Sequence, residues 1–597
     1  MQNKKWFPLG LILLCFACSK GPKIKEASQD AYPLSKDAIV FEGTGKRGGT
    51  LVLSAAGNPK TLNPLVATDT TSIDLLRPIN ATLINVDLDT LEYSYPLLKS
   101  KEISEDNKIY TFKIREGIRW SDGRPFTVDD ILFTYQVLTD PKLPLDLKST
   151  FEQRDKSFPK LKKIDEETIR FTLEDISVLF EAALSNMEIL PKHRWEESYK
   201  NGTFMNEMLI SMDTATFPSL GPYILDKIVP DQRIIYRRNP YYYVVDKSGT
   251  RLPYFDRVVR IITPDNNAML IKFQNGETDM HEVKADQYDL IARNAEKEDY
   301  TLFDIGASYT SYWFQVNQNT GKDKDGNPYV DPEKLKFFQD PQFKKALSHA
   351  TDRKGMIKTV FYERATPLYS ITPPADKTWS HPNLKTYPFD LETSRKLLDE
   401  LGLKDTDGDG IREFPGGKPI RLVMKTNTET NQRVQIGNIL KEDFKKVGID
   451  VNYQLVPFNN FISTLMDSFD YDIALLGWGS GIPPDPSEGR NVVLSNGRLH
   501  AWNPNQQTPV HVWEKQVDDL MYKNMSTMDL QERQKYWHQI LEIWGEELPQ
   551  IFILTPNVYL AARNKIGNVR PTAFMPYYAW NVEELYDKKL ESKEIDL

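Results

Sequence analysis

The sequence predicts an α/β protein, in which helices and strands alternate along the chain. Three segments in its second half give the clearest evidence. Residues 431–447 carry apolar side chains at helical spacing and are followed by Gly448, as expected of an amphipathic helix and its end. Residues 449–455 alternate between apolar and polar side chains, and residues 471–476 form a short apolar run, which is typical of a buried strand. This order of elements favours helices packed on sheets.

The length and the composition narrow the possible functions. The chain has 597 residues, enough for several core-sized units, a formal net charge of -9 and a pI near 5.6. Nucleic acid is not an expected partner, because a nucleic-acid-binding protein needs an excess of basic residues to displace counterions. Aromatic residues make up 11% of the chain. They fit either a large core or an aromatic-lined ligand cleft, and composition does not separate the two.

The N-terminus has the pattern of an export signal. A basic start and a short apolar run end at Ala17, so residues 1–17 are expected to be a signal peptide. The segment from Cys15 to Cys18 resembles the lipobox of bacterial lipoproteins, although Cys15 stands where that motif usually has Leu. This resemblance implies that a lipid is attached to Cys18. The alternative is an ordinary signal peptide with an incidental cysteine.

The segment after the signal is expected to be a tether. Residues 18–46 are mostly polar and show no sustained apolar periodicity, which is typical of a flexible spacer behind the lipid-bearing Cys18. The apolar run of the signal is shorter than the ~18 residues that a spanning helix needs, and no later segment is long and apolar enough. We therefore expect an exported protein of the cell envelope that is held to a membrane by its N-terminal lipid. No cysteine follows Cys18, so the body can contain neither a disulfide nor a thiolate metal site.

The first half of the body is expected to open on strands and turns. Residues 50–54 form an apolar strand, followed by the turn signals of residues 57–59. Residues 110–115 alternate at period two, and a turn is expected at residues 119–123. A helix should begin at Thr127, because an acidic residue three positions later completes a capping box.

Two further helices are predicted from their caps. Asp340 followed by Pro341 is typical of an N-cap and a first-turn proline, and the residues after them place an apolar stripe on one face. Asp390 should cap another helix, which Gly402 should end.

Several motifs, taken in order, resemble the bacterial extracellular solute-binding proteins of family 5, the peptide-binding class that supplies ABC importers. The motifs cover nearly the whole chain from about residue 48, and the first of them extends from Tyr95 to Leu138. They read YPLLKSKEISEDNKIYTFKIREGIRWSDGRPFTVDDILFTYQVL at Tyr95, LGPYILDKI at Leu220, RRNPYYY at Arg237, LPYFDRVVRIITPDNNAMLIKFQNGETDM at Leu252, FQDPQFKKALSHATDRKGMI at Phe338, GIDVNYQLVPFNNF at Gly448, DYDIALLGWG at Asp470 and WNVEEL at Trp580.

This resemblance implies a two-lobed periplasmic-binding-protein fold of the class with an extra subdomain, a discontinuous first lobe and a cleft that closes by hinge bending. It also implies the following organisation: 1–17 signal peptide, 18–46 lipidated cysteine and tether, 47–83 first lobe, 84–214 extra subdomain, 215–305 first lobe, 306–549 second lobe and 550–597 the C-terminal part of the first lobe.

The same resemblance implies a function in transport. The protein would be a monomer without a cofactor that captures short peptides in the cleft and delivers them to an ABC permease in the inner membrane. Peptides bound in this way are held by their main chain, which gives affinity with little choice of side chain. Two alternatives remain: an oligosaccharide or another small solute as the ligand of the same fold, and, more remotely, a secreted hydrolase.

Candidate ligand-binding residues lie near the ends of predicted strands. The resemblance places Asn58 and Pro59 at the cleft side of the first lobe, although turn chemistry alone also explains them. The same resemblance points to residues at the entry of the second lobe, where core packing is the alternative: Tyr309, Tyr312, Trp313 and Asn317.

The segment Gly477-Trp478-Gly479 is the strongest ligand-binding candidate. A buried strand that ends in this way offers exposed backbone polar groups beside an aromatic ring. Peptide-binding relatives commonly hold the ligand's ammonium group with an Asp a few residues later, where this chain has Gly481. Asp485 is the next acidic residue, so the means by which an amine would be held stays open.

Two arginines follow this segment. Arg490 or Arg498 could pair with a ligand carboxylate, although an exposed arginine usually makes no contact so specific.

An acidic segment resembles the beginning of a calcium-binding loop. Asp405, Asp407 and Asp409 stand at positions 1, 3 and 5 of the EF-hand pattern, but Gly416 occupies the twelfth position, where that pattern requires Glu. The alternatives are a weak calcium site and a tight acidic turn.

Motifs of enzymes are missing from the sequence. The glycine-rich segment after Leu476 has neither the central serine of a nucleophile elbow nor the spacing of a dinucleotide-binding loop. The seven histidines show no metal-binding pair at helical spacing. Paired carboxylates of a glycosidase are compatible with the composition, so the hydrolase stays as the remote alternative. We expect a binding protein and not an enzyme.

Overall fold

The computed structural model describes residues 32–590 except residues 154, 505 and 576. The predicted signal peptide and Cys18 therefore lie outside the described residues. Within the described part of the chain, no helix has both the length and the apolar character needed to cross a membrane.

The chain enters the fold through a short strand pair. β1 (Ile39–Phe41) pairs in parallel with β11 (Val244–Asp246), and the apolar side chains of Ile39 and Phe41 pack against a hydrophobic core. Nearby, the hydroxyl of Ser35 donates to the carbonyl oxygen of Glu116. The predicted tether of residues 18–46 is therefore too long at its C-terminal end. The polar composition of this segment gave no sign that residues 39–41 form a strand that pairs with β11.

The first lobe is built around a four-stranded sheet in the order β2-β12-β10-β9. β2 and β12 are parallel, and β10 is antiparallel to both of its neighbours. The elements of this lobe are β2 (Thr50–Ala55), α1 (Thr70–Leu76), β9 (Tyr223–Val229), β10 (Arg233–Arg238), β12 (Arg257–Ile262), α5 (Asn266–Gln274), β13 (Met280–Glu282), α6 (Tyr288–Asn294), β14 (Tyr300–Ala307), β21 (Ile566–Gly567) and β22 (Tyr586–Asp587).

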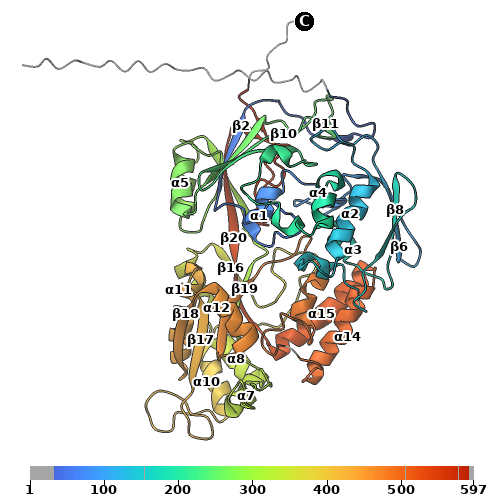
Figure 1. Ribbon diagram of the computed structural model, residues 1–597. Helices are drawn as coiled ribbons and strands as arrows, with labels where there is room; N and C mark the ends of the chain where they lie inside the picture. Colours follow the sequence, from blue (N-terminus) through green and yellow to red (C-terminus); the bar gives the residue numbers. More distant parts are fainter. Residues whose placement is uncertain (1–31, 154, 505, 576, 591–597) are drawn as a thin grey trace, which may run out of the picture.

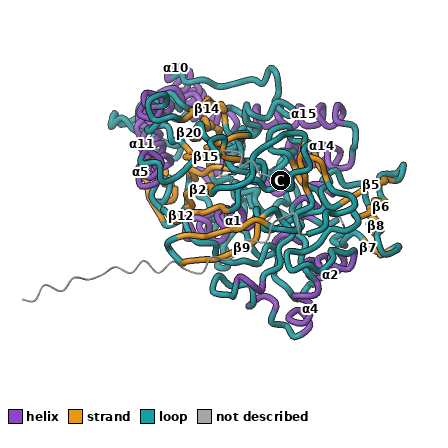
Figure 2. Tube along the Cα trace, turned by 90° about the horizontal axis from the view of Figure 1, so that it is seen from above, coloured by secondary structure: helices purple, strands orange, loops and turns teal. Residues whose placement is uncertain are grey.

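An extra subdomain lies between β2 and β9 in the sequence. Its four-stranded antiparallel sheet, in the order β5-β6-β8-β7, lies at one edge of the molecule, on the opposite side from α11 (Figure 2). Its elements are β3 (Asn85–Val86), β4 (Tyr93–Ser94), β5 (Leu98–Ile103), β6 (Ile109–Ile114), α2 (Val128–Thr139), β7 (Lys160–Lys163), β8 (Thr168–Thr172), α3 (Phe180–Ser185) and α4 (Lys192–Lys200). Phe133 and Trp195 pack into the core of the first lobe, so the two parts share buried surface.

The second lobe is the sequence from β15 to the first half of β20. Its strands β15, β19, β17 and β18 lie side by side, and apolar clusters fill both faces of the sheet. Its elements are β15 (Ser311–Val316), α7 (Pro332–Phe338), α8 (Pro341–Ala350), α9 (Arg353–Val360), β16 (Ala365–Pro367), α10 (Leu391–Glu400), β17 (Arg421–Asn427), α11 (Asn431–Lys445), β18 (Asp450–Val456), α12 (Phe458–Ser463), β19 (Ile473–Trp478), α13 (Arg490–Val493), α14 (Val512–Ser526), α15 (Leu530–Glu547) and β20 (Ile551–Arg563).

The local predictions from sequence are confirmed. Thr127 is the N-cap of α2, and Asp130 completes its capping box. Asp340 caps α8 with Pro341 in its first turn, and Asp390 caps α10. The two predicted strands of the second half are β18 and β19. β19 extends through Gly477 and Trp478, so these two residues belong to the strand itself.

One strand, β20, pairs within both lobes. The C-terminal part of β20 pairs with β14 in the first lobe, from Asn557 to Arg563, whereas its N-terminal part pairs with β15 in the second lobe. Figure 1 shows β20 running from one lobe into the other. Sequence analysis predicted that the last segment of the first lobe begins at residue 550. In the structure, residues 551–554 of β20 still pair with β15 of the second lobe. The chain crosses between the lobes near Pro556.

The crossing is tied by hydrogen bonds between β20 and the short connection from β14 to β15. The backbone N–H of Ser308 donates to the carbonyl oxygen of Pro556 at 2.9 Å. The hydroxyl of Thr555 donates to the carbonyl oxygen of Ser308 at 3.1 Å, and the two hydroxyl oxygens lie 3.1 Å apart. Both side chains are buried, so water cannot replace these bonds easily.

We predict that Thr555→Val destabilises the protein. The substitution keeps the shape of the side chain but leaves the buried oxygens of Ser308 with one partner fewer, which should lower the free energy of unfolding by about 1–3 kcal/mol. Urea denaturation of the purified protein measures this change. The control is Thr366→Val, since Thr366 bonds Asn557 at a half-buried position next to the same strand and should cost less. Equal losses in the two variants would contradict a special role for the crossing.

Candidate functional site

The two lobes meet in a small apolar cluster beside the crossing. Its buried members are Val86 and Leu88 of the extra subdomain and Phe574 of the first lobe. Half-buried residues from the extra subdomain, the first lobe, the crossing and the second lobe complete the cluster: Leu91, Tyr93, Tyr309, Ile482, Tyr577 and Trp580. We call this set the interlobe cluster. It marks the surface on which a ligand between the lobes would rest.

Tyr309 occupies the connection between β14 and β15 and touches both lobes. Its ring stacks on Phe574 of the first lobe, with centroids 4.1 Å apart and an interplanar angle of 10°. Its hydroxyl donates to the carbonyl oxygen of Ala375 in the second lobe at 3.3 Å. Burial, together with the charge of Asp376, raises the pKa of Tyr309 to about 12, so the hydroxyl keeps its proton near neutral pH.

The second lobe contributes the loop of residues 479–489, which follows β19. Ile482 in this loop belongs to the interlobe cluster. Arg490, the first residue after the loop, donates to the carbonyl oxygen of Ser149 in the extra subdomain at 3.2 Å. The structure therefore gives Arg490 a hydrogen bond between the lobes.

Asp485 is engaged within the second lobe. It caps the short helical turn that follows and pairs with Arg533 at 2.5 Å. The guanidinium group of Arg533 also lies over the ring of Trp379, 4.9 Å from its centroid. Asp485 is thus held in place by its neighbours, and its carboxylate is already neutralised by an internal cation.

Glu488 is the acidic residue of this loop that has no such partner. Its carboxylate accepts no hydrogen bond and forms no ion pair with any described residue. A Cβ atom placed on Gly481 would lie 3.1 Å from Cγ of Glu488, so the Glu488 side chain covers the position where the sequence lacks an acidic residue. Burial raises the pKa of Glu488, Arg490 opposes that effect and Asp485 adds to it. Sequence analysis missed Glu488, because a proline-rich loop carries no periodic signal.

The charges of these acidic groups reach Tyr93 of the extra subdomain. Burial raises the pKa of Tyr93, and the negative charges of Glu181, Asp485 and Glu488 raise it further. Glu181 belongs to α3 of the extra subdomain, whereas Asp485 and Glu488 belong to the second lobe. Because Asp485 is paired with Arg533, Glu488 is the second-lobe carboxylate whose charge near Tyr93 is not balanced by a direct ion pair.

A cavity of about 330 Å³ adjoins the interlobe cluster. Its walls come mainly from the first lobe, and Ile482 is contributed by the second lobe. Arg77 lies in the wall, 5.4 Å from the ring centroid of Tyr577, and it forms no ion pair or side-chain hydrogen bond with another described residue. Glu188 and Glu583 also line the cavity. The cavity thus offers both signs of charge beside aromatic rings.

The two cavity carboxyls are poorly solvated. Burial raises the pKa of Glu188 to about 7, although Asn80 donates a hydrogen bond to it and Arg77 favours its charge. Burial and then the charge of Glu584 raise the pKa of Glu583 as well. Both side chains are half-buried because they face the cavity, and the protein around them displaces part of their solvent.

The remaining predicted site residues lie away from this cavity. Asn58 exchanges two hydrogen bonds with Asp231 in the turn between β9 and β10, next to the buried Pro59. Tyr312 packs on the second-lobe core beneath Arg433, whose guanidinium carbon lies 5.8 Å from the ring centroid. The side-chain amide of Asn317 donates to the carbonyl oxygens of Phe469 and Tyr471. These contacts explain the four residues as parts of the fold, and we do not carry them into the proposed site.

Trp313 and Trp478 form one aromatic layer at the end of β19. Their ring centroids lie 5.1 Å apart, Trp313 is fully buried and Trp478 is half-buried. Gly477 lets the two strands approach, since a Cβ atom there would lie 2.7 Å from the carbonyl oxygen of Ser311. Gly479 is exposed and begins the loop of residues 479–489. Trp313 thus supports Trp478 from within the lobe, and Trp478 leads directly into the loop.

Comparisons with known proteins identify a family and several relatives that cover most of the chain. The family model for "Bacterial extracellular solute-binding proteins, family 5 Middle" matches residues 92–499. A "Probable ABC transporter-binding protein" of Deinococcus radiodurans is 26% identical over 93% of this chain and 94% of that protein. The oligopeptide-binding protein AppA of Bacillus subtilis is 26% identical over 87% and 88%. The periplasmic alpha-galactoside-binding protein of Rhizobium meliloti is 25% identical over 84% and 74%.

Solved structures agree on the fold. AppA of Bacillus subtilis in complex with a nonapeptide has a TM-score of 0.71 at 23% identity, covering 91% of this chain and 100% of that chain. MelB of Agrobacterium fabrum in complex with stachyose has a TM-score of 0.72 at 22% identity, covering 94% and 89%. NikZ of Campylobacter jejuni in complex with Ni(L-His) has a TM-score of 0.70 at 20% identity, covering 90% and 99%. The predicted periplasmic-binding-protein fold is confirmed.

We predict that Glu188→Gln stabilises the protein at pH 8 but not at pH 5. A carboxyl whose pKa is about 7 in the folded protein and 4.5 in the unfolded chain contributes fully below about pH 4.5. That contribution is lost as the pH rises through about 7, because the folded protein then has to hold a buried charge. Glutamine avoids the charge, so the gain at pH 8 should be on the order of 1–3 kcal/mol.

Urea denaturation at pH 5 and pH 8 measures this difference. Glu105→Gln, at an exposed position of the extra subdomain, controls for the loss of one negative charge. A gain in Glu188→Gln of the same size at both pH values would contradict the raised pKa.

Proposed function

Because the chain belongs to the bacterial extracellular solute-binding proteins of family 5, we propose that it captures short peptides between its lobes and delivers them to an ABC importer. Membership of this family makes it a solute-binding protein of an ABC transporter and not an enzyme. Its relatives include proteins named for oligopeptides and for alpha-galactosides. The class of solute is therefore the part of the function that we propose.

One observation favours a peptide, namely the carboxylate of Glu488. It lies in the loop of residues 479–489, is half-buried and forms no hydrogen bond or ion pair with a described residue. A partly buried carboxylate without a direct partner is costly, so a ligand that brings an ammonium group would be favoured there. Every peptide with a free N-terminus offers such a group. Tyr309 and Trp478, both half-buried, would supply aromatic surface, which suits side chains of different shapes.

An oligosaccharide is the second candidate. The half-buried rings of Tyr309 and Trp580 are surfaces on which sugar rings pack well, and the relative from Rhizobium meliloti is named for an alpha-galactoside. A neutral sugar has no group that would balance the charge of Glu488. This difference makes the peptide the stronger proposal.

The hinge follows from the crossing between the lobes. We propose that the lobes open and close by rotation about residues 308–310 and the middle of β20, where few chain segments connect them. In the closed state the interlobe cluster would cover the ligand, and the bond from Arg490 to Ser149 would help to hold the lobes together. A ligand that contacts both lobes would shift the equilibrium toward that state.

The proposed function predicts that peptides stabilise the protein. A library of tripeptides to pentapeptides should raise the melting temperature with little preference among side chains, because a ligand of the native state alone stabilises it by RT ln(1 + [L]/Kd). Glu488→Gln should weaken the binding of free-amine peptides at least about tenfold, the equivalent of ~1.4 kcal/mol, in calorimetry. Their N-acetylated forms should bind both proteins equally.

One control variant and two further outcomes complete the test. Glu532→Gln removes the same charge at an exposed position of α15 and should bind peptides as the unchanged protein does. Stabilisation by stachyose without stabilisation by any peptide would replace the peptide by a sugar. Equal binding of free and acetylated peptides to the unchanged protein would remove Glu488 as the anchor but leave a peptide ligand in place.

We also propose that the protein is exported, that residues 1–17 are removed and that a lipid at Cys18 attaches it to a membrane. Support comes from the sequence pattern at the N-terminus and from relatives that are named as periplasmic proteins. Cys18→Ser should abolish partition into the membrane fraction of cells and into the detergent phase. A single acyl chain binds a membrane only weakly, so the anchor should carry more than one. A Cys18→Ser protein that still sediments with membranes would disprove this attachment.

A further inference from the structure

An acidic loop of the second lobe, between α10 and β17, is built like a cation site. Its two ends are held together by a backbone bond, in which the N–H of Glu413 donates to the carbonyl oxygen of Lys404 at 2.9 Å. Residues 405–412 form the turn between these ends. None of them lines the cavity beside the interlobe cluster, so the loop has to be explained separately from the ligand site.

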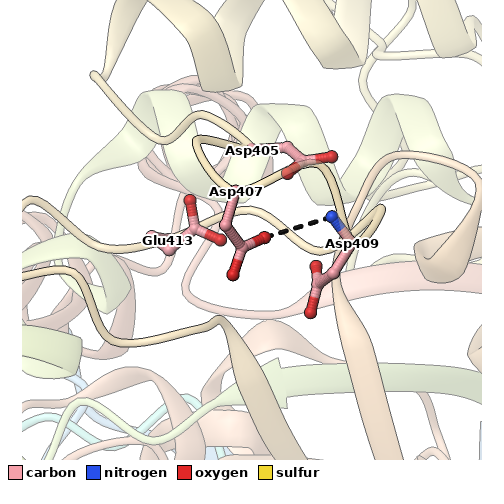
Figure 3. Close-up of side chains that lie close together, drawn as sticks. All are labelled: Asp405, Asp407, Asp409 and Glu413. Carbon is pink, nitrogen blue, oxygen red and sulfur yellow. Dashed lines mark hydrogen bonds between the residues drawn. The ribbon is translucent and has the colours of Figure 1, made fainter.

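Four carboxyl groups converge in this loop. Asp405, Asp407, Asp409 and Glu413 each offer one oxygen atom, and these atoms all lie within 4.8 Å of one another. Figure 3 shows the side chains of Asp407 and Glu413 facing each other, with Asp405 and Asp409 close by. Negative charges at such distances repel one another, and a bound cation would remove that repulsion.

The backbone supports the same interpretation. Asp405, Asp407 and Asp409 occupy positions 1, 3 and 5 of a calcium-binding loop, and the glycine required at position 6 is Gly410, with a φ of +87°. That φ lies in the left-handed region, which a residue with a side chain rarely adopts. Position 7 of such a loop supplies a backbone carbonyl oxygen, which is that of Ile411 in this chain.

Glu413 is the residue that points to a bound ion. Its side chain is almost fully buried, with 6% of the residue exposed. One carboxylate oxygen accepts hydrogen bonds from the backbone and the hydroxyl of Thr406, at 2.7 and 2.8 Å. The other oxygen, Oε1, is buried and has no hydrogen-bond partner among the described residues. A buried oxygen of a charged group is rarely left without a partner, so this atom calls for a ligand that the protein itself does not supply.

We propose that Asp405, Asp407, Asp409 and Glu413 bind a calcium ion. All four donors are carboxylate oxygens on a loop, which suits calcium, whereas magnesium demands a more rigid octahedral site and zinc prefers nitrogen and sulfur ligands. Gly416 stands at position 12, where a calcium-binding loop has a bidentate Glu. The buried Glu413 at position 9 would instead supply the last carboxylate ligand. The loss of the bidentate ligand places the dissociation constant in the weak range of extracellular modules, about 10⁻⁴–10⁻³ M.

Calorimetry of the full protein with calcium tests this site. After treatment with EDTA and its removal, calcium chloride should bind at one site with a dissociation constant of about 10⁻⁴–10⁻³ M, and equal concentrations of magnesium chloride should bind at least tenfold more weakly. At 10 mM calcium and a dissociation constant of ~1 mM, the folding equilibrium should shift about tenfold toward the folded protein. Thermal unfolding measures that shift independently.

Three variants assign the site to these residues. Glu413→Gln and Asp407→Asn should each weaken calcium binding at least tenfold. Asp407 is exposed, so Asp407→Asn remains informative even if Glu413→Gln fails to fold. Asp323→Asn is the matched control. It changes another acidic turn, in which Asp323 accepts from the backbone N–H groups of Asp325 and Asn327, and it should bind calcium as the unchanged protein does.

The possible results either support the site or overturn it. Calcium binding that is lost in Asp407→Asn and kept in Asp323→Asn supports it. The proposal is overturned if calcium neither binds nor shifts unfolding, if magnesium acts equally, or if Asp407→Asn binds calcium normally. In each of those cases residues 405–413 would be an acidic turn only.

Discussion

The architecture depends on one strand that belongs to both lobes. β20 pairs with β14 on one side of Pro556 and with β15 on the other, so the two lobes share a continuous run of backbone hydrogen bonds. A shared strand resists sliding of one lobe along the other, because sliding would break the register of both strand pairs. Twisting about the strand leaves most pairs intact. The hydroxyls of Ser308 and Thr555 fix the point about which such twisting would occur.

The interface beside this strand combines two kinds of surface. Aromatic rings from the first lobe and the crossing form its apolar part. The second lobe contributes the acidic side chains of Asp485 and Glu488. Asp485 is neutralised by Arg533, but the charge of Glu488 is not balanced by a direct partner among the described residues. The selectivity of the site would therefore depend more on the unpaired carboxylate than on the rings. Aromatic surface accepts many shapes, whereas an isolated charge favours ligands of opposite sign.

Most of the fold could be predicted from the sequence because its signals are local. Helix caps such as Thr127, Asp340 and Asp390 act within one turn, and the period of β18 appears within a few residues. The site was harder to predict because its contacts join distant positions. Arg490 finds its acceptor at Ser149, and nothing near Arg490 in the sequence indicates this partner. Glu413 was missed for a related reason, since its importance comes from burial and not from its place in a motif.

The docking of β1 on β11 has a mechanical consequence. Three residue pairs of this parallel ladder join Ile39–Phe41 to Val244–Asp246, and the buried guanidinium of Arg251 donates to the carbonyl oxygen of Tyr32 at 2.9 Å. A force applied to the chain ahead of Tyr32 along the strand would load these bonds together in shear, instead of opening them one at a time. The force would be borne by the first lobe and the extra subdomain. If the N-terminus is fixed to a surface, the second lobe is the body that is free to swing.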